Sequence, residues 1–262
     1  LVGGIMRNNG RFTATEEAIA LGGGELFDIT DQTARHRNIE FPGHKHATLY
    51  DISTTPPAVT DYLLSIGVKI VYHSRIEKLV MTNQTIHAIG CKKGKTYAGD
   101  VFVDATGTAG PMANCKKYGN GCAMCILRCP SFGGRVSLTG LAGVTELVGK
   151  KSSGAVGAMS GSCKLFKESL SPEIVAELNE KGVALVPVPQ NLVEDHLDIK
   201  ACQQYALAEF CDNIVLLDTG HAKLMSPYFE IHRLQQIPGL EKARYEDPYS
   251  GGQGNSMRFF AM

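Results

Sequence analysis

Tryptophan is absent from this 262-residue chain, and neither sign of charge is in excess, because 26 acidic residues balance 26 basic ones. Without a basic excess, the composition indicates neither a nucleic-acid partner nor an anionic membrane surface. An apolar run approaching the ~20 residues that a membrane-spanning helix needs is also missing. The composition therefore predicts a soluble globular protein, with length for one large domain or two smaller ones.

Targeting signals and a disulfide framework are missing as well. The first six residues, LVGGIM, resemble neither a secretion signal nor a transit peptide, and together with the apolar end they suggest a piece of a longer protein. The eight cysteines are too unevenly placed for an extracellular framework, because four of them fall within fifteen positions. We therefore expect a cytoplasmic location, where clustered cysteines usually serve metal binding or thiol redox chemistry.

The first 110 residues predict two helices and a series of strands. A short helix is expected over residues 13–22, followed by glycines, and a second one begins at Thr54 and ends before Gly67. Between them, residues 28–50 are polar and irregular, and they predict a surface loop or an excursion from the first domain. The alternation of β-branched and polar residues predicts strands at 68–73, 75–81, 86–92, 96–98 and 101–104, with a small antiparallel meander among them.

The second half has a different character, with glycine and serine frequent from residue 152 to 161. A helix is expected over residues 171–180, with Pro172 in its first turn and Gly182 beyond its end. A strand at 183–188, a helix at 197–211 and a strand at 213–217 complete the series. The best domain boundary lies between residues 110 and 115.

The segment from Val101 to Gly110 is where a ligand is most strongly indicated. A buried strand is expected to break into small residues at Ala105, Thr106 and Gly107, with Gly110 close behind. Such small side chains allow a diphosphate to reach backbone N–H groups that larger side chains would hold away. The alternative is a plain turn that ends a strand, but the series of strands ahead of it favours a nearby nucleotide.

Four cysteines follow in the pattern Cys-x6-Cys-x2-Cys-x3-Cys-Pro, at Cys115, Cys122, Cys125 and Cys129. Grouped thiolates with a proline after the last one occur in iron–sulfur proteins, although the spacing departs from the bacterial ferredoxin run. Zinc is the rival metal, because four thiolates also make a closed tetrahedral site. A Cys122/Cys125 dithiol that exchanges electrons with a flavin, and buried cysteines without a ligand, remain as the other interpretations.

The order of elements from Val68 to Gly110 resembles that of two-dinucleotide-fold flavoproteins of the glutathione-reductase-like superfamily. Within it, the spacing is most similar to the succinate-dehydrogenase-like and tRNA-uridine-modifying flavoproteins. The resemblance covers about the first 112 residues and rests on the glycine pair Gly3-Gly4, the helix-to-glycine passage at 17–23 and the Ala105-Thr106-Gly107 turn. It implies bound FAD, with the backbone of Ile76 against the adenine.

The sequence departs from that family pattern at the diphosphate-binding loop. The Gly-x-Gly-x-x-Gly loop that grips the diphosphate is nowhere in this sequence. We therefore expect an α/β fold in two parts. Residues 1–112 form an incomplete FAD-binding Rossmann-like domain with a β-meander, and residues 113–262 form a mixed α+β substrate or cap domain with the cysteines. By itself, such a piece should bind FAD weakly or not at all.

These features predict part of a flavin-dependent oxidoreductase that moves hydride or electrons between a small-molecule substrate and FAD. A [4Fe-4S] cluster would relay electrons to a partner. The alternative is a non-catalytic binding module stabilised by zinc. The sequence identifies no catalytic residue, and it predicts no nucleic-acid or membrane partner.

Other polar and sulfur side chains receive weaker predictions. His44 and His46, with Arg35 and Arg37, are candidates for contact with an anionic substrate, although a solvated loop is the simpler interpretation. His221 is expected to be an exposed turn residue rather than a general acid or base. The dispersed cysteines are expected to be small structural residues; they are Cys91, Cys163, Cys202 and Cys211.

Overall fold

The computed structural model describes residues 10–11, 15–105, 136–144, 163–193, 209–225 and 231–245. Within these ranges, helices and strands mix along the chain, as the predicted α/β class requires. The strands form three small sheets, and every strand pair in them is antiparallel. Among the helices described, none is long and apolar enough to cross a membrane.

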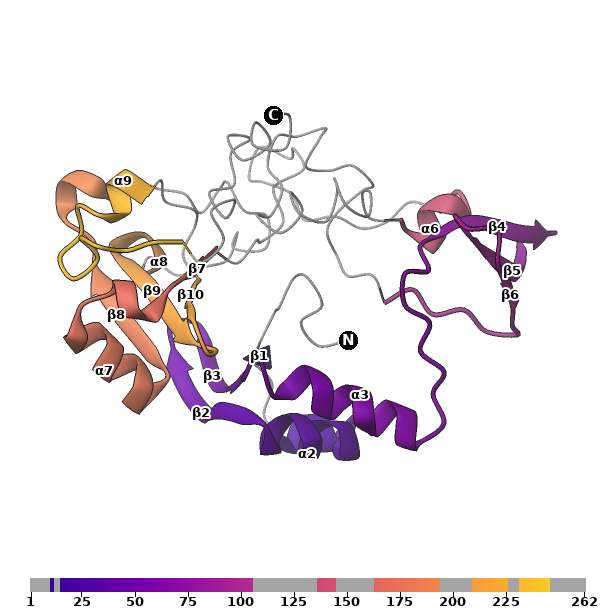
Figure 1. Cartoon of the computed structure of the whole chain (residues 1–262), viewed down its shortest axis with the longest axis horizontal. Coiled ribbons are helices and arrows are strands. Elements are labelled where there is room, and N and C mark those ends of the chain that lie inside the picture. The colour runs from indigo at the N-terminus through magenta and orange to yellow at the C-terminus, as the bar shows by residue number, and fades with distance from the viewer. Residues whose placement is uncertain are drawn as a thin grey trace.

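The N-terminal part combines three helices with the first sheet (Figure 1). The helices are α1 (Thr15–Ala20), α2 (Gly24–Gln32) and α3 (Thr55–Ser65), and the sheet has the order β1-β3-β2. Its strands are β1 (Gly10–Arg11), β2 (Ala34–Phe41) and β3 (His44–Tyr50). Helices α1 and α3 confirm the two predicted helices.

The prediction of a surface loop within residues 28–50 is wrong, because α2 and the β2–β3 hairpin occupy this stretch. The hairpin turns at Gly43, whose φ of 77° lies in the left-handed region that glycine adopts without strain. The charged residues of β2 make its sequence look like a loop. The hairpin is stabilised by Phe41, Ala47 and Leu49, which pack against Val215 and Leu217, about 170 positions further along the chain.

The predicted meander is confirmed as a second sheet, β4-β5-β6. It consists of β4 (Ile76–Thr82), β5 (Thr85–Cys91) and β6 (Thr96–Ala98). Asn83 and Gln84 connect the first two strands with φ values of 48° and 63°, as a tight hairpin turn requires. The register follows from this turn, with Thr82 opposite Thr85.

The strands predicted at 68–73 and 101–104 are absent from the structure, although both stretches lie within the described residues. Their valines are β-branched, which favours a strand locally, but no described strand lies alongside to supply hydrogen bonds. Val101 and Val103 are 80% and 81% exposed, so the expected buried strand before Ala105 is also wrong.

The third sheet has four strands in the order β7-β10-β9-β8. They are β7 (Cys163–Leu165), β8 (Val183–Pro187), β9 (Asn213–Asp218) and β10 (Ala222–Leu224). Helix α7 (Pro172–Lys181) precedes β8, and the short helices α6 (Leu138–Leu141), α8 (Glu209–Asp212) and α9 (Ile231–Leu234) complete the described part, with 3-10 turns at Lys167–Ser169 and Gln190–Leu192.

The predictions for α7, β8 and β9 are confirmed. Ser171 caps α7 by accepting from the Ile174 N–H, and Gly182 ends the helix with a φ of 77°. Most of the helix predicted at 197–211 lies outside the described residues, and α8 covers its end.

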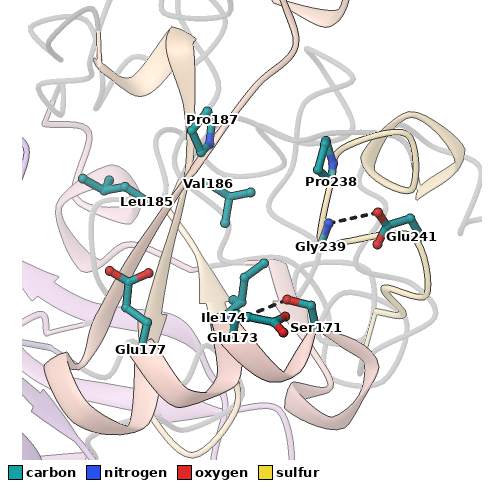
Figure 2. A pocket seen from close by; sticks show the side chains of 10 residues that line it. All are labelled: Ser171, Glu173, Ile174, Glu177, Leu185, Val186, Pro187, Pro238, Gly239 and Glu241. Carbon is teal, nitrogen blue, oxygen red and sulfur yellow. Dashed lines mark hydrogen bonds between the residues drawn. The ribbon is translucent and has the colours of Figure 1, made fainter.

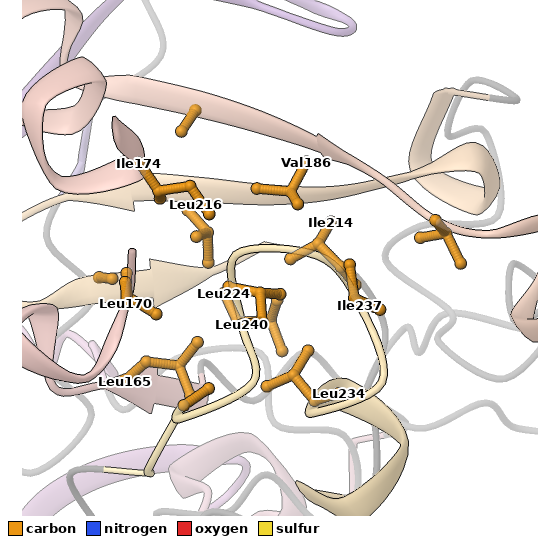
Figure 3. Packing of buried hydrophobic residues seen from close by; sticks show 14 of the residues in the cluster. Leu165, Leu170, Ile174, Val186, Ile214, Leu216, Leu224, Leu234, Ile237 and Leu240 are labelled. Carbon is orange, nitrogen blue, oxygen red and sulfur yellow. The ribbon is translucent and has the colours of Figure 1, made fainter. Parts of the chain in front are cut away.

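The main core lies on both faces of β9. Ile214 and Leu216 pack with Ile174 of α7, Leu234 of α9 and Leu240 of the loop after it (Figure 3). Val215 and Leu217 point to the opposite face, where they meet Phe41, Ala47 and Leu49 of the β2–β3 hairpin. Alternate side chains of one strand thus join two layers. The contacts of Val215 and Leu217 with the β2–β3 hairpin therefore join residues from both sides of the predicted boundary at residue 112. The boundary itself falls in 106–135, outside the described ranges.

Candidate functional site

The predicted cofactor-contacting residues fall mostly outside the described ranges. Gly3, Gly4, Thr106, Gly107 and Gly110 all lie there. Ile76 is described; it opens β4 half-buried, opposite Cys91 of β5. Ala105 is also described, and it is exposed at the end of a stretch that forms neither helix nor strand. The roles of Ile76 and Ala105 at a nucleotide remain predictions.

Asp104, beside Ala105, holds the chain to a distant segment. Its Oδ2 accepts a hydrogen bond from the Leu138 N–H at 2.8 Å, across 34 positions of sequence. Leu138 begins α6, whose cap is the fully buried Ser137, with Oγ accepting from the Gly140 N–H at 3.0 Å. Helix α6 lies beside β4 in Figure 1. The two ends of the intervening segment therefore meet at the meander.

The four clustered cysteines belong to that intervening segment. Cys115, Cys122, Cys125 and Cys129 lie outside the described residues, so their ligation remains a prediction. Over the ranges that are described, no group of three or more His, Cys, Asp or Glu side chains is arranged to hold a metal ion. Cys91 is buried as a free thiol, as predicted, and Cys211 is a partly buried free thiol.

The densest group of charges surrounds Asp218, the last residue of β9. Its side chain is 0% exposed, and its Oδ2 accepts from Nε2 of His36 at 2.8 Å and from Nε of Arg35 at 3.2 Å. Its Oδ1 accepts from Nζ of Lys167 at 3.0 Å and from the Gly220 N–H at 3.1 Å. Nearly all the acceptor capacity of a buried carboxylate is therefore used.

A second carboxylate, Asp51, extends this Asp218 cluster. Its Oδ2 accepts from Nη1 of Arg35 at 2.8 Å, and its Oδ1 accepts from the Ser53 and Thr54 N–H groups ahead of α3. The Arg35 guanidinium therefore bridges two carboxylates: Asp51, which follows β3, and Asp218, which ends β9. On the other side of Asp218, Nζ of Lys167 also donates to Oδ1 of Asn179 on α7 at 2.6 Å.

Opposing effects act on the pKa of each carboxyl group. Burial by itself raises the pKa of Asp218, but the hydrogen bonds from His36, Lys167 and the Gly220 N–H outweigh it, and the pKa lies below its ordinary value. Asp51 follows the same pattern: burial raises its pKa, whereas Arg35 and the backbone donors bring it below the ordinary value. Both side chains are therefore carboxylates at neutral pH. The hydrogen bonds and ion pairs of the Asp218 cluster hold the β2–β3 hairpin against the four-stranded sheet, and in this sense the cluster is a pin.

The structure corrects the weaker predictions for charged side chains. Arg35 is engaged with carboxylates of the chain itself, whereas Nη2 of the exposed Arg37 donates to the backbone carbonyl of Asp31. Burial lowers the pKa of His44, whose ring lies 4.6 Å from that of Phe41. The prediction that His221 is exposed is wrong, because it is 3% exposed beneath the turn that follows β9.

A groove of about 450 Å³ lies between α7, β8 and the loop at 238–241 (Figure 2). Three carboxylates line it, those of Glu173, Glu177 and Glu241. Its apolar lining includes Leu185, Pro187 and Pro238. The sequence analysis missed this groove, although the one-turn spacing of Glu173 and Glu177 on a predicted helix is a sign that the two share a face.

Comparison with known proteins places the chain in a family. None of the curated proteins compared with the chain matches it. A family model described as "Glucose inhibited division protein A" matches residues 2–209, which is most of the chain and includes both the predicted nucleotide-contacting residues and the clustered cysteines. Proteins of this family bind FAD. The chain therefore belongs to the glucose-inhibited division protein A family of flavoproteins.

Proposed function

We propose that this chain is part of a flavin-dependent oxidoreductase in which FAD takes up hydride or electrons from a small-molecule substrate. The observation that carries the proposal is the family match over residues 2–209. In such an enzyme the flavin supplies the redox chemistry, and the protein binds it, orients it and keeps water away. The confirmed β4-β5-β6 meander adds support, because it stands where the resemblance to flavoproteins expects it.

The described residues supply only part of an FAD site. Ile76 offers backbone at the start of β4, and Ala105 offers a small side chain at the point where the chain enters the glycine-containing segment. The diphosphate would rely on the backbone of Thr106, Gly107 and Gly110 and on a Gly-x-Gly-x-x-Gly loop that this sequence lacks. The chain alone is therefore expected to bind FAD weakly or not at all.

A titration of the chain with FAD, followed by flavin fluorescence, tests this placement. Replacing Thr106 by Leu puts bulk where the diphosphate should meet the backbone, and we expect FAD affinity to fall by about tenfold or more. Val103→Leu is the matched control, because this neighbouring side chain is exposed and should tolerate the change. Equal FAD affinity of the two variants would contradict the placement.

We further propose that Cys115, Cys122, Cys125 and Cys129 hold a [4Fe-4S] cluster that passes electrons from reduced FAD to an electron-transfer partner. The cysteine–proline pattern supports a cluster. The Asp104–Leu138 hydrogen bond supports its proximity to the flavin, because it closes the segment that contains both Thr106–Gly110 and the cysteines. Oxidation of the substrate would reduce FAD by two electrons, and the cluster would carry them away singly.

Anaerobic reconstitution with iron and sulfide tests the cluster. The chain should take up iron and develop broad visible absorption, and the double variant Cys122→Ser/Cys125→Ser should lose both. Cys211→Ser is the control, because this thiol lies outside the pattern. A colourless protein that retains stoichiometric zinc would instead support the zinc-stabilised binding module, and unchanged metal content in the double variant would remove these two cysteines from any site.

The proposed substrate is a small molecule rather than a nucleic acid. The equal numbers of acidic and basic residues support this choice, because binding to nucleic acid draws on an excess of positive charge. A fluorescence-anisotropy titration with transfer RNA at moderate salt should give no saturable binding. Tight, salt-dependent binding would overturn this part of the proposal and leave the flavin assignment intact.

A further inference from the structure

Strand β8 forms one edge of the four-stranded sheet, because the order is β7-β10-β9-β8. The hydrogen bonds at its two ends reveal which residues face β9. The Gly182 carbonyl accepts from the Asp218 N–H, and the Val188 N–H donates to the Asp212 carbonyl, each at 2.9 Å. Backbone N–H and C=O groups alternate in direction along an antiparallel strand. Those of the even-numbered residues therefore point toward β9, and those of Val183, Leu185 and Pro187 point away from the sheet.

Within the described ranges, this outward edge has no strand partner, and its second half is exposed. Val183 packs with the core beneath the β2–β3 hairpin, whereas Leu185 is 42% exposed. Proline lacks an N–H, so Pro187 contributes only its carbonyl, and Leu185 provides the one complete donor and acceptor pair there.

The groove with three carboxylates runs along this same edge. Figure 2 shows Leu185 on one side of β8, with Ile174 and Val186 on the other, and Glu173 and Glu177 on the helix beside them. Glu177 contacts Nζ of Lys181 at 3.1 Å on the exposed helix surface, and Glu241 accepts from the Gly239 N–H at 3.1 Å. Among the residues that the structure describes, Lys181 is the one cation paired with these carboxylates, so this part of the groove is acidic in a chain whose overall charge is balanced.

Edge and groove together specify the chemistry of a ligand. An extended peptide paired with Leu185 would direct alternate side chains to opposite faces of the sheet. One set would meet the carboxylates of Glu173 and Glu177, which favour lysine or arginine, and the other set would meet Leu185, which favours an apolar residue. Backbone pairing would provide affinity, and the alternating side chains would provide selectivity.

We propose that the edge of β8 binds an extended segment of a partner protein in which basic and apolar residues alternate, added to the sheet as a fifth strand. The occupant is identified by charge complementarity and by the open backbone of Leu185. The inference does not rest on flavin chemistry. A failure here would leave the proposed function untouched, because the binding assay uses no cofactor.

A fluorescent peptide of about seven residues, alternating lysine and valine, is a suitable probe, because strands of this length are common. Anisotropy with the unmodified chain should give saturable binding. Methylating the peptide nitrogens that would face β8 should weaken it by about tenfold or more, since each such nitrogen loses its hydrogen bond. The protein is unaltered in this comparison, so a folding defect cannot explain the result.

Protein variants then test the residues. Glu173→Gln/Glu177→Gln should weaken the lysine peptide by about fivefold and reduce the salt dependence of binding, because exposed ion pairs contribute up to about 1 kcal/mol each. Glu180→Gln is the matched control, an exposed glutamate of the same helix that does not line the groove. Leu185→Pro should abolish binding by removing the outward N–H, with circular dichroism to verify the fold.

Four outcomes would overturn the proposal. The first is no binding of the lysine peptide, and the second is equal binding of the N-methylated peptide. The third is self-association of the chain through this edge that the peptide does not reverse, because the occupant would then be a second copy of the chain. A glutamate-containing peptide that binds as tightly as the lysine peptide would refute the charge selectivity and with it the stated partner.

Discussion

The strand β9 and the meander β4-β5-β6 differ both in sequence, an apolar run against alternating apolar and polar residues, and in what surrounds them. Four consecutive residues of β9, from Ile214 to Leu217, are fully buried, with a packed layer on each face. In the meander, Val80 is 50% exposed, and the buried residues of β5 are Ala88, Gly90 and Cys91. The comparison teaches that a strand is formed by local pairing, whereas its stability depends on what covers its faces.

The layers over β9 come from distant parts of the sequence. Helix α7 and the loop at 237–243 cover one face, and the β2–β3 hairpin covers the other. The Asp218 cluster joins these layers at the end of the strand. The meander instead depends on short turns between neighbouring strands. Its register is therefore a local property, while the burial of β9 is a property of the whole fold.

Removal of the Asp218 carboxylate should have the largest effect on this difference. Asp218→Ala leaves the partly buried side chains of His36 and Lys167 without their anion, and we expect the unfolding free energy to fall by about 3 kcal/mol. Urea denaturation measures the loss. Asp100→Ala, at an exposed carboxylate after the meander, is the control and should change stability by less than about 0.5 kcal/mol. Equal losses would show that the Asp218 cluster is not a pin.

Truncation of the core of β9 should follow in size. Leu216→Ala removes a fully buried side chain and leaves a cavity against α7, at an expected cost of about 2–5 kcal/mol. Val80→Ala is the counterpart in the meander, where half-exposure limits the expected cost to about 0.5 kcal/mol. If the two variants lost similar amounts of unfolding free energy in thermal or chemical denaturation, the proposed difference between β9 and the meander would be wrong.

Two glycines separate backbone strain from crowding. Gly182 and Gly94 have φ values of 77° and 81°, but an added Cβ lies 2.7 Å from Cγ of His36 at Gly182 and meets nothing within 4 Å at Gly94. Gly94→Ala should therefore cost about 1–2 kcal/mol from conformation alone. Gly182→Ala should cost about 2–4 kcal/mol, because the His36 ring must also shift. Equal losses in denaturation would indicate that the ring moves freely.

Acid should weaken the Asp218 cluster by less than truncation does, because a protonated carboxyl retains some of its hydrogen bonds. The pKa of Asp218 is lowered from its ordinary 3.8 in the folded chain. Its stabilising contribution is therefore complete above about pH 5 and is lost as the pH falls through and below 3.8. Urea midpoints between pH 6 and pH 3 test this. The Asp218→Ala variant should lose part of the pH dependence, and an unchanged slope would contradict the assignment.

Local sequence signals predicted much of the fold. Ser171, Pro172 and Gly182 mark both ends of α7, and the turns at 83–84 and 93–94 delimit the meander strands. Where an element depends on distant residues, the predictions are wrong. The β2–β3 hairpin was expected as a loop because its charged residues find partners such as Asp218 only after folding. Conversely, Val101 and Val103 were expected in a strand, and they lack a described neighbour with which to pair.

The candidate sites divide in the same way. The sequence resembles flavoproteins in the order of its elements and small residues, and the family match agrees with this resemblance. The nucleotide-contacting residues and the cysteine ligands remain predictions, because only Ile76 and Ala105 among them lie in the described ranges. The groove beside β8 was missed because it combines Glu241 with residues of α7 and β8 that lie more than fifty positions earlier.

The sequence by itself determined the helix ends and the meander, because capping and turn residues act over a few neighbouring positions. It also carried the resemblance to flavoproteins, with which the family match agrees. Tertiary structure alone decided that His36 and Arg35 meet Asp218, that β9 is buried on both faces and that β8 keeps an open acidic edge. These features require segments far apart in the chain to come together. Short-range preferences carry no information about such contacts, and burial and charge pairing arise only once the layers are packed.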